Sequence, residues 1–226
     1  MAEETGNEAL EKLATFVVQQ MEAGQPKAAI VKKVIEMGVA EEEAESLVTP
    51  LFDETVKQAQ AELFTPDSLV PAVLGGLLVA VLGGAIWGAV VAATNYEIGY
   101  LAWGLGLAAG LVVVKATGGK KGLIPQVIAV VSSVGGILLG KYFTFYYFFK
   151  QAVTKQAAAN PAAEEFLKGV SVYSPEIIKT FLGSLKEIVT GHDALWIILA
   201  VFTAWSMAKA ISLPAAILHS QPRDRI

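Results

Sequence analysis

The stretch LVPAVLGGLLVAVLGGAIWGAVVAAT, residues 69–94, is apolar over its whole length and contains no charged side chain. A helix that crosses a bilayer needs about 20 consecutive, mostly apolar residues. Lipid offers no hydrogen-bond partner to backbone N–H and C=O groups, so a single span of this kind must be helical. The stretch therefore predicts a transmembrane helix and a membrane protein.

Three further stretches have the same character, and the four spans are expected at about 69–94, 98–117, 123–149 and 194–214. Hydrophobic residues make up 54% of the chain and charged residues 17%, whereas a soluble domain carries about 25% charged residues. This balance disfavours an ordinary soluble enzyme. The sequence predicts an all-α protein in which residues 68–226 form a four-helix transmembrane domain.

Residues 1–67 differ in composition and predict a separate soluble module. They hold five Lys and fourteen Asp or Glu, whereas residues 68–226 hold twelve basic and seven acidic residues. Apolar residues recur at helical spacing in three segments, which predicts a module of about three helices. Because nucleic acid is bound through Lys and Arg, the acidic balance predicts no nucleic-acid partner.

One part of this module, AIVKKVIEMGVAEEEAESLV from Ala29 to Val48, combines an apolar helix, a Gly turn and an acidic helix start. It resembles short helical modules that precede bacterial membrane domains, and also ubiquitin-associated folds. The functional interpretation is a module that docks a cytoplasmic protein partner. The candidate docking residues are Ile30, Val34, Met37, Leu47 and Val48. The alternative is a small bundle that packs on itself or on neighbouring copies.

Positive charges near the spans predict the orientation, because cytoplasmic loops carry the excess of Lys and Arg. They lie between the second and third spans and after the fourth, at Lys115, Lys120, Lys121, Arg223 and Arg225. The N-terminus, the 115–121 loop and the C-terminus are therefore expected in the cytoplasm. An amphipathic helix at about 175–190, between the third and fourth spans, is expected at the outer surface.

Glycines four residues apart predict close helix packing in the first three spans. The pairs are Gly84 and Gly88, Gly106 and Gly110, and Gly136 and Gly140. Small residues at this spacing flatten one helix face, so that two backbones can approach closely in lipid. The sequence leaves open whether these faces meet within one copy or between the copies of an oligomer.

Glu97 and Lys141 are expected at the same outer level of the membrane, where they predict an intramembrane ion pair. Ionisable side chains at membrane depth are candidates for function. The alternative for Lys141, as for Lys209 near the inner end of the fourth span, is that the ammonium reaches the lipid headgroups. Asp193, just before the fourth span, is expected to cap that helix.

The residue types that common catalytic and metal sites need are scarce. The chain has no Cys and two His, and it contains neither a Ser-His-Asp set nor an HExxH motif. We therefore expect no enzymatic activity, no cofactor and no metal site.

Three segments of the predicted membrane domain carry a resemblance: YEIGYLAWGLG at 96–106, ILLGKY at 137–142 and DALWIILAVFTA at 193–204. They resemble a group of uncharacterised bacterial multi-span membrane proteins that share a YEIGxxAWGxG hairpin, an LLGKY segment and a DxLW opening. The resemblance implies a bacterial inner-membrane location and no particular activity. It draws attention to Glu97 and Lys141, because both lie in matching motifs.

Together these features predict a non-catalytic integral membrane protein. It would act as an oligomeric scaffold or as an accessory subunit of a membrane complex, with the N-terminal module docking the partner. The alternative is an oligomeric channel or small-solute transporter, gated by polar groups of the third span or by the Glu97–Lys141 pair.

Overall fold

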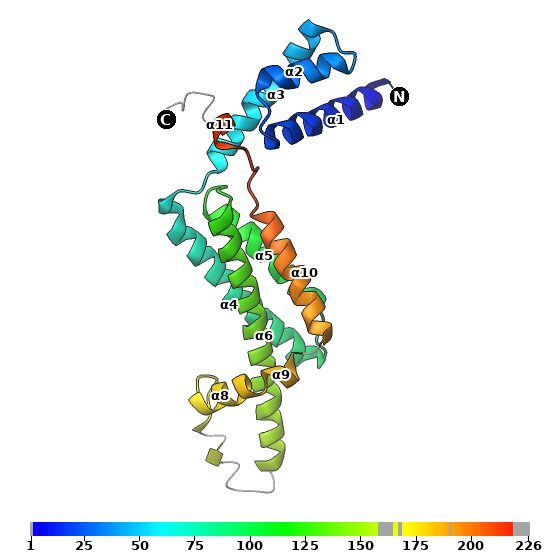
Figure 1. Cartoon of the computed structure of the whole chain (residues 1–226). Coiled ribbons are helices and arrows are strands. Elements are labelled where there is room, and N and C mark those ends of the chain that lie inside the picture. The colour runs from blue at the N-terminus through cyan, green and yellow to red at the C-terminus, as the bar shows by residue number, and fades with distance from the viewer. Residues whose placement is uncertain (1, 158–164, 167–168, 190, 219–226) are drawn as a thin grey trace. The chain divides into compact units, whose positions relative to one another are not determined.

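The structure, a computed structural model, describes residues 2–157, 165–166, 169–189 and 191–218. Its regular elements within these ranges are helices, which confirms the all-α fold class (Figure 1). In chain order they are α1 (Ala2–Glu22), α2 (Lys27–Glu36), α3 (Glu41–Glu62), the 3-10 turn η1 (Pro66–Ser68), α4 (Leu69–Thr94), α5 (Tyr100–Ala116), α6 (Leu123–Ala157), α8 (Pro175–Gly183), α9 (Leu185–Ile188), α10 (Gly191–Met207) and α11 (Ala215–Leu218).

The chain forms two compact units, and the boundary differs from the one predicted. The first unit joins the described residues up to Leu63 with those from Ala210 onwards, and the second runs from Phe64 to Lys209. The sequence assigned the segment after the fourth span to the membrane domain. That assignment is wrong, because Leu213 and Ile217 are buried in the core of the first unit.

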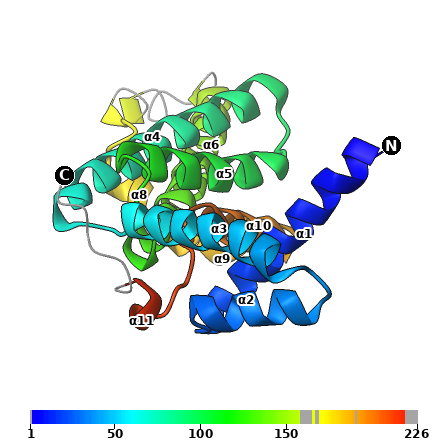
Figure 2. The same cartoon turned by 90° about the horizontal axis from the view of Figure 1, so that it is seen from above.

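The first unit is a helical bundle of α1, α2 and α3, completed by α11 (Figure 2). Gly24 and Gly38 follow α1 and α2 with φ angles of +79° and +99°, a backbone region that glycine enters without steric cost. A hydrogen bond also stabilises the position of α11. The Gln60 Nε2 donates it to the carbonyl oxygen of Leu218 over a distance of 2.5 Å. Residues far apart in sequence therefore build one core.

Three of the five candidate docking residues lie in that core. Ile30, Val34 and Val48 have no exposed surface, so they stabilise the module itself and cannot contact a partner. The docking assignment is wrong for these three, because an apolar helix face is covered by neighbouring helices of the same chain before any partner arrives. Met37 is 57% exposed and Leu47 is half-buried, so these two remain accessible.

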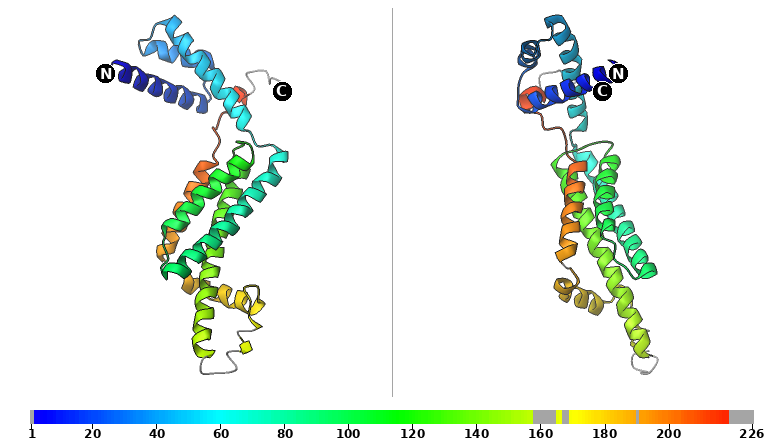
Figure 3. Two further views of the ribbon diagram at one scale, coloured as in Figure 1. Left: turned by 180° about the vertical axis from the view of Figure 1, so that it is seen from behind. Right: turned by 90° about the vertical axis from the view of Figure 1, so that its right-hand side faces the viewer.

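The four longest helices described in the second unit, α4, α5, α6 and α10, alternate in direction along the chain (Figure 3). Contacts advance together along α4 and α6: a Cβ at Gly76 would meet Ser132, and one at Gly88 would meet Phe143. These two helices are therefore parallel neighbours. By the same test α5 and α10 are parallel, because Gly99 faces Trp196 and Gly110 faces Met207.

Two stretches of the second unit have the length and composition of a membrane span, and these are Pro66–Thr94 and Leu123–Ala157. α5 and α10 are also apolar but shorter, at 17 residues each. α10 ends at Met207, although the sequence predicted a span to about residue 214, because the chain beyond Ala210 belongs to the first unit.

Where the sequence predicted one amphipathic helix at about 175–190, the described residues form two short helices, α8 and α9. α8 and α9 are separated at Ser184. Phe181 of α8 is buried and packs its ring against Tyr142 and Phe145 of α6, with ring centroids 5.2 and 5.7 Å apart. Phe181 is thus covered by α6, whereas Ile178 and Leu182 of α8 are 39% and 56% exposed.

The contact between α5 and α10 makes a prediction with a matched control in the same helix. A Cβ at Gly106 would lie 2.3 Å from the carbonyl oxygen of Ala200, whereas a Cβ at Gly104 would have nothing within 4 Å. We expect Gly106→Ala to lower the free energy of unfolding by about 1–3 kcal/mol, because the two backbones must separate. Gly104→Ala should leave it unchanged or raise it by up to about 1 kcal/mol through helix propensity.

Denaturant unfolding of the protein in detergent, followed by circular dichroism, measures both variants. Equal effects at the two positions would contradict the α5–α10 contact.

Candidate functional site: a buried charge cluster

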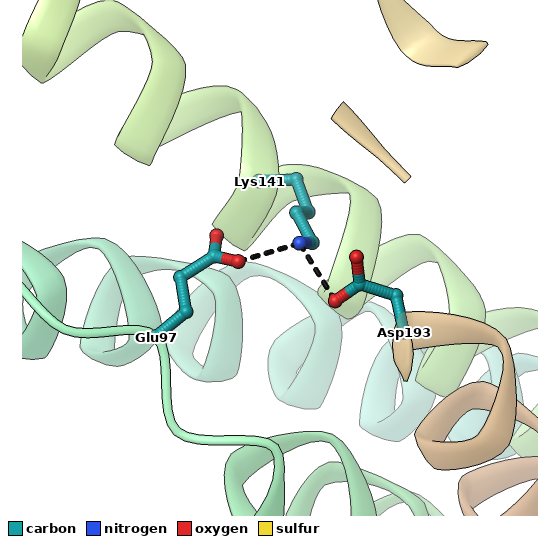
Figure 4. Close-up of polar contacts among 3 residues, drawn as sticks. All are labelled: Glu97, Lys141 and Asp193. Carbon is teal, nitrogen blue, oxygen red and sulfur yellow. Dashed lines mark hydrogen bonds and ion pairs between the residues drawn. The ribbon is translucent and has the colours of Figure 1, made fainter. Parts of the chain in front are cut away.

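Lys141 lies in the middle of α6, its side chain is 2% exposed, and its ammonium contacts two carboxylates (Figure 4). Its Nζ lies 2.6 Å from Oε2 of Glu97 and 2.8 Å from Oδ1 of Asp193. Both are charge-assisted hydrogen bonds of the short kind, which are stronger than neutral ones. The three residues form a cluster with one ammonium and two carboxylates.

Each member comes from a different part of the second unit. Glu97 lies in the turn between α4 and α5, where Asn95 ends α4 with a φ of +56°. Asn enters this left-handed region more readily than most residues, so the chain can reverse there. Asp193 lies in the first turn of α10. Because the helices alternate in direction, the end of α4 and the beginnings of α5 and α10 meet at one end of the bundle.

The helix packing next to Lys141 explains why it is so deeply buried. Gly140 precedes it, and a Cβ there would lie 2.6 Å from the Trp87 ring of α4. The indole therefore covers the α6 backbone beside the lysine. An ammonium without a partner in such surroundings would cost several kcal/mol, so the two carboxylates are a condition for placing Lys141 here.

Exposure within the cluster is graded. The side chain of Lys141 is 2% exposed, that of Asp193 is 17% exposed, and that of Glu97 is 36% exposed. The ammonium is therefore the most buried of the three charged groups, and the two carboxylates lie closer to the surface of the unit. Chemically the arrangement ties the α4–α5 turn, α6 and α10 together.

The structure brings together the two residues that the sequence paired, Glu97 and Lys141. The headgroup alternative for Lys141 is wrong, because its ammonium is buried and paired. Lys209, for which the same alternative was considered, is exposed. Sequence reasoning missed Asp193, which it treated as a helix cap alone. A signal was present, since each of the three resemblance motifs contributes one member of the cluster.

All six glycines of the predicted packing faces make their close contacts within the chain. Gly84 and Gly88 of α4 face α6, and Gly136 and Gly140 of α6 face α4. Gly106 and Gly110 of α5 face Ala200, Ala204 and Met207 of α10. The alternative that the sequence left open is thereby decided in favour of packing inside one copy.

No group of three or more His, Cys, Asp or Glu side chains that could hold a metal ion occurs among the described residues. Comparison with known proteins adds no relative: no protein-family model, no curated protein and no solved structure matches the chain. The resemblances to bacterial multi-span proteins and to ubiquitin-associated folds stay predictions.

The graded exposure predicts an unusual order of destabilisation. In Glu97→Gln/Asp193→Asn the buried ammonium loses both carboxylates, and we expect a loss of about 3–5 kcal/mol in the free energy of unfolding. Lys141→Met leaves two partly exposed carboxylates that water can hydrate, so its loss should be smaller. The triple variant, which removes all three charges, should recover much of the loss of the double variant.

Chemical denaturation in detergent gives this order, with Lys209→Met as the matched substitution at an exposed lysine. If Lys141→Met lowered the free energy of unfolding more than the other variants, this would contradict the claim that the buried ammonium needs the two carboxylates.

Proposed function

We propose that α4, α5, α6 and α10 all cross a bilayer, with the first unit on its cytoplasmic side. The parallel packing of α4 and α6 supports this arrangement. Two adjacent parallel spans require the chain to return across the membrane between them, and α5 is the helix that lies between them in sequence. Its 17 residues measure about 25 Å, and a bilayer adapts to a slightly short span by thinning.

The composition of the first unit supports the fourth crossing. This unit contains the chain before Leu63 and also the chain after Ala210. A folded unit lies on one side of a membrane, so the segment between these residues must cross an even number of times. If α4, α5 and α6 each cross the membrane, α10 must be the fourth crossing, which brings the chain back to the first side. The lysines after α5 favour the cytoplasm for this side, and the resemblance favours the bacterial inner membrane.

The absence of Cys from the sequence allows a clean test of this topology. Met37→Cys and Lys115→Cys should react with a membrane-impermeant maleimide only after the cells are opened. Tyr96→Cys and Tyr173→Cys, at residues 74% and 83% exposed, should react in intact spheroplasts. Reaction of Lys115→Cys and Tyr96→Cys from the same side would contradict a crossing by α5.

The function that we propose is that of a non-catalytic accessory subunit or scaffold, whose first unit docks a cytoplasmic protein. The observation that carries the proposal is the completion of this unit by both flanks of the membrane segment. The first unit is thus joined to the membrane segment by two chain connections. Such a unit can hold a bound partner close to the membrane. Because the glycine faces are filled within one chain, we favour an accessory subunit over an oligomeric scaffold.

The mass of the nanodisc-embedded protein, with its co-purifying chains identified, tests this choice. One copy together with defined subunits is the expected result. A homo-oligomer without other chains would contradict the accessory role and favour the scaffold. A single copy without any companion would contradict both.

A second candidate function is the oligomeric channel or small-solute transporter. It is favoured by three buried polar atoms in the described part of the second unit that lack a hydrogen-bond partner, namely Trp87 Nε1, Ser133 Oγ and Thr144 Oγ1. Ser133 and Thr144 are eleven residues apart on α6, which places them on one face of the helix. Water satisfies such atoms in proteins. Ion or solute flux through proteoliposomes tests this function, and a sealed bilayer would exclude it for the solutes used.

A further inference from the structure

The apolar faces of α1 and α3 are only partly covered by the core of the first unit. On α1, the apolar residues Leu10, Ala14, Val17 and Met21 follow one another at helical spacing. Val17 and Met21 are fully buried, whereas Leu10 is 49% exposed. The face therefore continues beyond the core towards the N-terminal half of the helix, where Leu10 is about half exposed.

A groove of about 590 Å³ lies between α1 and α3 at this uncovered end. Its apolar wall is formed by Leu10 and Ala14 from α1, and by Leu47, Pro50 and Leu51 from α3. Leu47 is one of the two candidate docking residues that the structure leaves accessible. A groove with apolar residues from two helices is the shape in which an amphipathic helix can bury its apolar face.

The charges around the groove are negative. Glu11 lines it. Glu43 and Glu54 are exposed and lie one turn before Leu47 and one turn after Pro50 on the same side of α3. Lys12, the lysine nearest to the groove along α1, is paired with Glu8 at 3.8 Å. Residues 1–67 as a whole hold fourteen acidic and five basic residues.

This charge selects among the conceivable occupants. A second copy of the unit would bring the same acidic rim against this one, and like charges across an interface cost free energy. The cytoplasmic leaflet of a membrane is anionic and repels an acidic surface. A protein segment with Lys or Arg beside its apolar residues is complementary in both charge and polarity.

We propose that the groove between α1 and α3 docks an amphipathic helix of a cytoplasmic protein, with apolar residues at positions i, i+4 and i+7 and with Lys or Arg on both flanks. The inference rests on the docking role proposed above and names the site and the chemistry of the partner. It moves the docking site away from the buried Ile30, Val34 and Val48.

The test is a selection on the full chain in nanodiscs. The probe is a displayed library of 18-residue helical peptides that share one apolar stripe and vary between Lys, Arg, Glu and Gln on the flanks. We expect enrichment of basic flanks. Peptides from the enriched pool, measured by fluorescence anisotropy, should bind at least tenfold more weakly to Leu10→Gln/Leu47→Gln and should lose affinity as salt is raised.

The matched control is Leu63→Gln, which changes a 38% exposed apolar residue of the same unit outside the groove. It should leave the affinity unchanged. Thermal unfolding of the groove variant checks that its unit remains folded, as expected for residues outside the core. Enrichment of acidic or uncharged flanks, failure to enrich any flank, or equal binding to the groove variant would overturn the proposal.

Two further outcomes separate this inference from the proposed function. Self-association of the chain that the groove variant abolishes would identify a second copy as the occupant and overturn the inference. A native partner that co-purifies equally well with the wild-type chain and with the groove variant would overturn the inference while leaving the accessory role intact.

Discussion

Close contact between the parallel helices α4 and α6 is the constraint on which the rest of the second unit depends. A Cβ at Gly84 would lie 3.1 Å from the carbonyl oxygen of Gly136, and a Cβ at Gly136 would lie 3.2 Å from the Cα of Ala80. The backbones therefore touch, as they do where helices associate in lipid without a hydrophobic driving force. Because α4 and α6 are parallel, α5, which connects them in sequence, must run in the opposite direction. α10 follows α6 and runs parallel to α5.

The charge cluster follows from this arrangement. Lys141 comes directly after Gly140, so the glycine that admits Trp87 also buries the lysine. The cost of that burial is offset because the helix ends at this level supply Glu97 and Asp193. The glycine faces and the charged groups of this cluster thus make their contacts within the second unit. The first unit has an exposed apolar groove with an acidic rim, which is the docking site proposed above.

Much of this could be predicted from residue spacing. Helices and their apolar faces follow from periodicity, and the Glu97–Lys141 pair follows from placing two ionisable residues at one level of an alternating bundle. Asp193 escaped notice because an acid in a first helical turn already has a sufficient local explanation as a cap. The docking residues were misplaced because periodicity identifies an apolar face without identifying what covers it, and for Ile30, Val34 and Val48 the cover is the module's own core.

By itself the sequence determined the all-α class, the apolar character of the helices from Leu69 onwards, and the acidic character of the module before them. These properties depend on composition and on contacts along the chain. Only the tertiary structure decided that Leu213 and Ile217 complete the first unit, that the glycine faces meet within one copy, and that Asp193 joins Lys141. The physical reason is the same in each case: the partner lies dozens of residues away or more, and packing geometry rather than local preference selects it.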